Sequence, residues 1–72
     1  MSLFTQALLF EQYGGRLDLD ALEKVLGWKK NTMYNMVAQG TLPVKTYLDG
    51  GKRWADYRDV AEYLDEQRKK AA

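Results

Sequence analysis

The sequence predicts a mainly α-helical domain with one small β-hairpin, in the order helix, helix, helix, hairpin, helix. Two observations predict this fold class: apolar residues recur at helical spacing in four segments, and an Asp-Gly-Gly turn separates two runs rich in β-forming residues. A third observation sets the size, because 72 residues of which 46% are hydrophobic can build one core. We therefore expect residues 1–72 to form a single domain.

The first helix is expected within residues 3–13, where apolar side chains recur close to the helical period. Gly14 and Gly15 should end it, since paired glycines break helical patterns. Residues 1–15 then form an N-terminal helical segment that two interpretations fit. It enlarges the core, or it provides a contact between copies of the chain.

A second, shorter helix is expected within residues 18–27. Asp18 or Asp20 caps its start, because a short carboxylate satisfies free amide N–H groups and opposes the helix dipole. Gly27 ends the helix. The spacing predicts one buried stripe, formed by Leu22, Val25 and Leu26.

The third helix is expected over residues 30–39, with Gly40 as its C-terminal stop and Pro43 just beyond it. The period then changes to two. Residues 44–48 and 52–55 are the two expected strands, and residues 49–51 form the tight turn between them.

The last helix is marked by apolar residues near the end of the chain, with Asp59 as its expected cap. These apolar residues are Val60, Ala61, Tyr63 and Leu64. The helix ends in the basic run of residues 68–70, which opposes the helix dipole.

The composition excludes several classes of function. The chain has no cysteine and no histidine, so disulfides, thiolate metal sites and histidine-based acid–base or nucleophilic catalysis are excluded. No apolar run approaches the roughly 20 residues that cross a bilayer, and the residues after Met1 lack the basic start of a secretion signal. We therefore expect a cytoplasmic protein that is not an enzyme, has no cofactor and does not bind a membrane.

Basic charge is concentrated in the middle of the chain, although the formal net charge is only +1. Residues 27–58 carry six cations against two carboxylates, a balance of +4, which leaves −3 for the rest of the chain. A local excess of cations is what a nucleic-acid-binding surface requires, although solvated surface charge also produces such an excess by chance.

Residues 30–38, placed on a helix, separate into two faces. Met33, Met36 and Val37 fall on one side, and the opposite side carries Lys30, Asn31, Tyr34, Asn35 and Ala38. Such a division is common in amphipathic helices, but it also suits a helix that reads DNA, because an Asn amide can pair with adenine while Lys contacts guanine or phosphate. With the preceding helix and the turn at residues 27–29, it predicts a helix-turn-helix.

The hairpin turn offers a second contact to a polyanion. Lys52 and Arg53 follow two glycines, so the backbone can approach a phosphate closely while two cations neutralise it. A solvated turn is an equally good interpretation of the same residues. Trp28 and Trp54 are interpreted mainly as core residues, Trp54 because it alternates with Arg53 along the strand.

Five motifs follow one another between residues 17 and 64: Val25-Leu26-Gly27-Trp28, Thr32-Met33-Tyr34, Gly40-Thr41-Leu42-Pro43, Gly50-Gly51-Lys52-Arg53-Trp54 and Asp59-Val60-Ala61-Glu62-Tyr63-Leu64. Their order and spacing resemble the excisionase-like, MerR-type winged helix-turn-helix DNA-binding domains. Residues 8–14, Leu-Leu-Phe-Glu-Gln-Tyr-Gly, are similar to a segment that precedes the helix-turn-helix in pyocin-activator-type prophage regulators.

The resemblance implies a recognition helix in the major groove of double-stranded DNA and a two-stranded wing on the neighbouring backbone or minor groove. It implies either an excisionase, which bends DNA at attachment sites, or a small transcription regulator of phage genes. An integrase or RNA polymerase would be the protein partner, and copies of the chain would assemble on repeated sites. A third interpretation, a protein-interaction adaptor or antirepressor, is supported by residues 31, 35 and 38, where members of the families that the chain resembles commonly have Arg.

Ten residues are expected to contact DNA on this interpretation. They are Lys29, Lys30, Asn31, Thr32, Tyr34, Asn35, Lys45, Lys52, Arg53 and Arg58.

Overall fold

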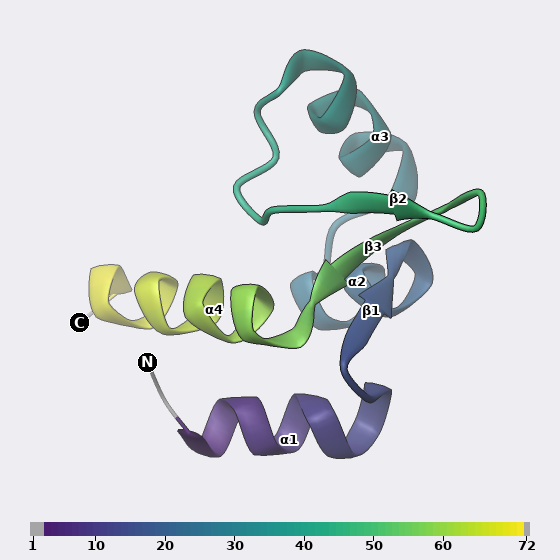
Figure 1. Ribbon diagram of the computed structural model, residues 1–72. Coiled ribbons are helices and arrows are strands. Elements are labelled where there is room, and N and C mark those ends of the chain that lie inside the picture. Colours follow the sequence, from purple (N-terminus) through teal and green to yellow (C-terminus); the bar gives the residue numbers. More distant parts are fainter. Residues whose placement is uncertain (1–2, 72) are drawn as a thin grey trace.

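The computed structural model describes residues 3–71 (Figure 1). The ends of the expected 1–72 domain, namely residues 1–2 and 72, lie outside the described residues. Residues 3–71 form four helices and three strands in the order α1 (Leu3–Tyr13), β1 (Arg16–Asp18), α2 (Leu19–Leu26), α3 (Lys30–Gln39), β2 (Tyr47–Asp49), β3 (Lys52–Asp56) and α4 (Tyr57–Ala71). The fold is therefore mainly helical with a small antiparallel sheet, and all four expected helices are present.

The sheet has one strand more than the expected hairpin. Its order is β1-β3-β2, and β1 pairs antiparallel with β3 so that Leu17 lies opposite Ala55. Both of these side chains are fully buried. Pairing with β3 defines this short strand. It was not expected, because three residues are too few to show a strand period in the sequence.

The hairpin is formed, but its strands are shifted from the expected bounds. β2 begins at Tyr47 rather than at residue 44, and Val44 instead lies buried in the segment before it. Asp49 belongs to β2, and the turn consists of Gly50 and Gly51 alone, with φ angles of 61° and 80°. Two successive positive φ angles suit a tight two-residue hairpin turn, which explains the need for glycine at both positions.

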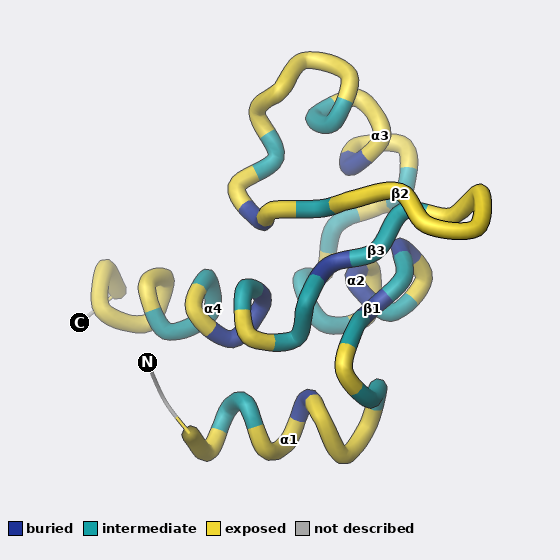
Figure 2. The backbone as a smooth tube through the Cα atoms, viewed as in Figure 1, coloured by how far each residue is buried: buried dark blue, intermediate teal, exposed yellow. Residues whose placement is uncertain are grey.

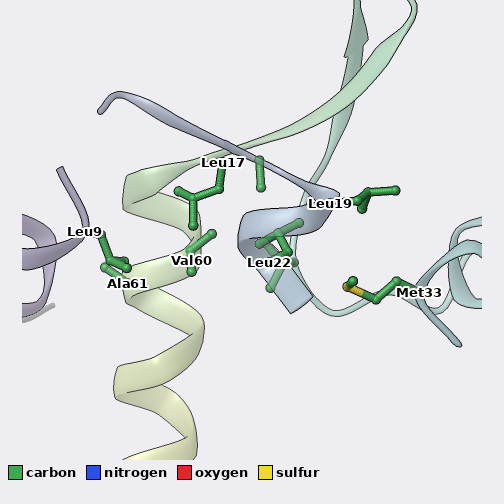
Figure 3. Packing of buried hydrophobic residues seen from close by; sticks show 9 residues of the cluster. Leu9, Leu17, Leu19, Leu22, Met33, Val60 and Ala61 are labelled. Carbon is green, nitrogen blue, oxygen red and sulfur yellow. The ribbon is translucent and has the colours of Figure 1, made fainter. Parts of the chain in front are cut away.

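The core lies where α2, α3 and α4 meet the inner face of the sheet. Figure 3 shows Leu17, Leu22 and Val60 pointing toward one another, and Met33 of α3 closes the cluster. Leu22 of the expected α2 stripe is fully buried, and the other two members of that stripe are partly buried against the core. Trp28 also packs on the core, with its ring edge-on to Tyr63 at a centroid distance of 5.7 Å.

Trp54 does not belong to the core, so its interpretation as an inward-facing residue is wrong. Ala55 is the buried residue of β3, and strand alternation therefore directs Trp54 to the opposite face of the sheet. There the Arg16 guanidinium lies 3.9 Å from the ring centroid of Trp54, and the indole Nε1 donates a hydrogen bond to the Asp49 carbonyl oxygen at 3.1 Å.

Capping hydrogen bonds and a glycine with positive φ determine where the helices begin and end. Asp18 caps α2 by accepting a hydrogen bond from the Ala21 amide at 2.9 Å, and Gly40 ends α3 with a φ of 71°. The expected cap of α4 at Asp59 is wrong, because α4 begins at Tyr57 and Asp59 lies in its first turn. Asp56 performs that role instead, since its carboxylate accepts the Arg58 amide N–H at 2.8 Å.

Helices α1 and α3 lie on opposite sides of the molecule (Figure 1). Helix α1 packs along α4, and α3 lies beyond α2 on the side of the β2–β3 hairpin. Within residues 3–71, no helix is both long enough and apolar enough to cross a membrane.

Candidate nucleic-acid interface

Helix α3 presents the two faces that its spacing predicts. Met33 is fully buried, and Met36 and Val37 are partly buried. The exposed residues of this helix include four of the predicted contacts and Ala38: Asn31, Thr32, Tyr34, Asn35 and Ala38. The predicted contact Lys29, just before the helix, is exposed as well. The buried Met33 anchors the helix, and its polar face is therefore held toward solvent.

The start of α3 is fixed by the helix before it. Lys29 occupies the N-cap position in an extended conformation, and its side chain makes no capping hydrogen bond. The Glu23 carboxylate of α2 instead accepts the Lys30 amide N–H at 3.1 Å. A carboxylate at this position satisfies a free amide and opposes the helix dipole, so Glu23 orients α3 relative to α2. The residues next to Lys30 give no sign of this contact, because the capping carboxylate comes from another helix.

A groove of about 390 Å³ lies between α3 and the hairpin. Lys30, Tyr34 and Val37 line it from α3, and Leu48, Gly51, Lys52 and Arg53 line it from the hairpin. The floor is formed by the junction of β1 and α2, at Asp18, Leu19 and Asp20. The structure therefore brings the two predicted contact regions, the third helix and the hairpin turn, to one surface.

Charge in the groove is mixed. Three cations, Lys30, Lys52 and Arg53, stand against two carboxylates, Asp18 and Asp20, which leaves a balance of +1. Lys30 is not free, because its ammonium forms an ion pair with the Asp20 carboxylate. The hydrogen bond and charge of Lys30 lower the pKa of Asp20, and the same contact raises the pKa of Lys30. The pair therefore stays ionised at neutral pH.

Lys52 and Arg53, the two cations of the hairpin, differ in burial and in the contacts that their side chains make within the protein. Arg53 is partly buried, and its Nη1 donates a hydrogen bond to the Thr46 hydroxyl oxygen at 2.9 Å. Lys52 is exposed at the turn, and its ammonium lies 6.0 Å from the ring centroid of Trp54. Lys52 is therefore the more accessible of the two cations to a phosphate group.

Arg16 supports the hairpin, although the sequence pattern gives no indication of this role. Its Nη1 lies 2.6 Å from the Asp49 carboxylate across the sheet, and this hydrogen bond raises the pKa of Arg16. The salt bridge joins β1 to the start of the turn, so Arg16 supports the hairpin from the outer face of the sheet. A contact between residues 33 positions apart leaves no local signal in the sequence.

Only four of the ten predicted contacts line the groove, namely Lys30, Tyr34, Lys52 and Arg53. The other six do not: Lys29, Asn31, Thr32, Asn35, Lys45 and Arg58. Lys45 lies beside α4 in a second groove whose lining includes Asp59, Glu62 and Glu66. Arg58 lies in the first turn of α4, at the other end of β3 from the hairpin turn. Its guanidinium donates two hydrogen bonds to the Asp56 carboxylate, both at 3.0 Å. Lys45 and Arg58 are both exposed, and Arg58 is paired with a carboxylate of its own chain.

No group of three or more acidic side chains within residues 3–71 is arranged to hold a metal ion. The groove offers ammonium, guanidinium and phenol groups around two carboxylates, and the Asn31 and Asn35 amides are exposed on α3 outside it. Such groups suit contacts to phosphates and base edges. Comparisons of the chain with protein-family models, with curated proteins and with solved structures find no match.

Proposed function

We propose that the protein binds double-stranded DNA sequence-specifically as a winged helix-turn-helix, with α3 in the major groove and the β2–β3 hairpin against the neighbouring backbone. One observation carries this function: Lys30 and Tyr34 of α3 line the same groove as Lys52 of the hairpin turn. A helix and a β-ribbon that share one exposed surface can contact a groove and its flanking phosphates together.

The polar face of α3 suits base recognition. Asn31 and Asn35 are exposed and lie one helical turn apart, about 6 Å along the axis, a distance that corresponds to roughly two base pairs. An Asn amide can donate to N7 and accept from N6 of adenine, and so distinguishes adenine from the other bases in the major groove. Lys52 at the turn provides the contact to phosphate, which does not depend on sequence.

Within this class we propose an excisionase, on the resemblance given above, with small transcription regulators as the alternative. One reading helix covers a short site, so useful specificity requires several copies on repeated sites. An integrase-dependent excision assay, with and without the protein, distinguishes the two roles. Unchanged excision together with a change in the output of a nearby promoter identifies the regulator.

The binding test is a mobility shift with a library of genomic fragments, followed by anisotropy titrations on the selected and a scrambled duplex. We expect Asn35→Ala and Asn31→Ala to reduce the preference for the selected site, at about 1–3 kcal/mol for each lost base contact. Lys52→Ala should weaken binding to both duplexes alike. Arg53→Ala should do the same, but it also removes the hydrogen bond to Thr46.

Lys70→Ala is the matched control, because it removes the same charge from an exposed residue that lies in the second groove, on α4. Equal losses on both duplexes for the Asn and Lys52 variants would contradict the separate roles of helix and hairpin. If no fragment is retarded at about 50 mM salt, where phosphate contacts are strong, the DNA-binding function is refuted and a protein-interaction role replaces it.

A further inference from the structure

Helix α1 leaves most of its large apolar side chains exposed. Leu9 is its buried residue and Tyr13 packs partly buried against the core, whereas Thr5 and Gln6, which are also partly buried, are polar. The Thr5 hydroxyl donates to the Asp65 carboxylate of α4 at 3.4 Å. The large apolar side chains face solvent instead, with exposed fractions of 78% for Leu3, 72% for Phe4, 49% for Leu8 and 54% for Phe10.

These exposed side chains form one continuous strip. Leu3, Ala7 and Phe10 follow one another at intervals of four and three residues, the spacing of a helix–helix contact seam, and Phe4 and Leu8 lie beside them. A shallow groove of about 380 Å³ follows the seam, lined by Leu3, Gln6, Ala7, Phe10, Glu11 and Tyr57. A contiguous apolar strip on a small domain marks an interaction site.

The strip suits a second copy of itself. A two-fold interface places each residue against its counterpart or a symmetry-related neighbour, so it cannot contain many charges of one sign. Helix α1 carries a single charged residue, Glu11, near its C-terminal end. Ala7 lies near the middle of the seam, with Leu3 and Phe10 on either side of it. Two antiparallel copies crossing near Ala7 would therefore place Leu3 of each copy against Phe10 of the other, with the small residue where the helices approach most closely.

The position of α1 leaves the proposed DNA surface free. Figure 2 shows the exposed side of α1 at one end of the molecule and α3 at the other. A dimer through α1 would thus carry its two α3 helices outward on opposite sides of the contact.

We propose that two copies of the chain associate through an antiparallel, two-fold contact between their α1 helices, centred near Ala7. The contact is a single short helix pair, and small interfaces of this kind belong to reversible dimers. Association should therefore depend on concentration, from monomer at low micromolar to dimer toward millimolar concentration. It requires no DNA, so its outcome is independent of the proposed function.

Sedimentation velocity across this concentration range tests the contact. We expect the mass to rise from 8.3 kDa to twice that value. Ala7→Glu and Ala7→Lys should each weaken association by at least about tenfold, because two like charges meet near the two-fold axis. An equimolar mixture of the two variants should restore it, since opposite charges then face each other. Gln12→Glu, an exposed position on another side of α1, should associate as the unmodified chain does.

The direction of the helices is tested by cross-linking, because the chain contains no cysteine of its own. A mixture of Leu3→Cys and Phe10→Cys should form the mixed disulfide in preference to either symmetric product. Circular dichroism checks that each variant keeps its helices, which is expected because Leu3, Ala7 and Phe10 are exposed. A chain that stays at 8.3 kDa at millimolar concentration, or an Ala7→Glu variant that associates as tightly as the unmodified chain, overturns the proposal.

Discussion

Replacing Asp20 by Asn tests how much of the groove's positive charge is neutralised within the protein. Asp20 holds the Lys30 ammonium in an ion pair, and both side chains are partly exposed. The substitution keeps the size of the side chain but removes its charge. The balance of the groove then changes from three cations against two carboxylates to three against one, or from +1 to +2. Lys30 also becomes free to contact a phosphate of bound DNA.

The expected magnitude follows from counterion release. Each additional phosphate that a protein neutralises steepens the fall of log K with log salt concentration by about 0.9. One released lysine should therefore add about 0.9 to the slope. Between about 50 mM and 200 mM salt, the variant should lose about 3.5-fold more affinity than the unmodified protein. At the low-salt end it should bind any duplex more tightly, because a carboxylate no longer competes with phosphate for Lys30.

Fluorescence anisotropy with a labelled duplex over this salt range measures the slope. The pKa of Asp20 is lowered by Lys30, so at neutral pH the carboxylate is ionised and the substitution removes a full charge. Glu62→Gln is the control, because it makes the same change in net charge at an exposed residue in the second groove, on α4. If Asp20→Asn and Glu62→Gln give the same slope, Lys30 is not held back from DNA by Asp20, and the reasoning fails.

Three further predictions concern stability. Met33→Ala should cost about 2–5 kcal/mol in urea unfolding, because the side chain is fully buried. Trp54→Ala should cost less than Met33→Ala in the same measurement, since Trp54 lies on the outer face of the sheet and is only partly buried; an equal or larger loss would return Trp54 to the core. Arg58 lowers the pKa of Asp56, so this carboxylate stabilises the fold above its unfolded pKa, and the contribution is lost as pH falls through the lowered value. The difference in melting temperature between the unmodified protein and Asp56→Asn should therefore shrink between about pH 6 and pH 2, and a constant difference would exclude the ion pair as its cause.

The helices were predictable because each carries its own signals. The expected limits of residues 30–39 match α3, and Gly40 ends it in the left-handed conformation that favours glycine. Asp18 caps α2 as one of the two expected candidates. These features depend on residues within a few positions of one another, so the sequence contains all the information that they need.

The sheet was less predictable because pairing decides it. The face of β3 is set by Ala55, which lies opposite Leu17 and is fully buried. Alanine gives a weak hydrophobic signal and tryptophan a strong one, so the pattern alone favoured Trp54 as the inward residue. The pairing of β3 with a strand nearly forty positions earlier in the sequence instead buries Ala55 and leaves Trp54 on the outer face. Which side chains of a short strand are buried thus depends more on the strand that it pairs with than on the hydrophobicity of the side chains themselves.

Counting cations in the sequence overstates what a bound polyanion would meet. Of the six cations in the middle of the chain, three have internal hydrogen-bond or ion-pair partners: Lys30 pairs with Asp20, Arg53 with Thr46 and Arg58 with Asp56. On the proposed function, each must exchange its internal partner for a phosphate before it adds to affinity. The exchange is favourable only where a phosphate lies within reach, and a correctly docked duplex meets that condition at more positions than a misaligned one. The internal pairs would therefore reduce non-specific binding more than specific binding, because they make the net gain from each cation depend on the register of the DNA.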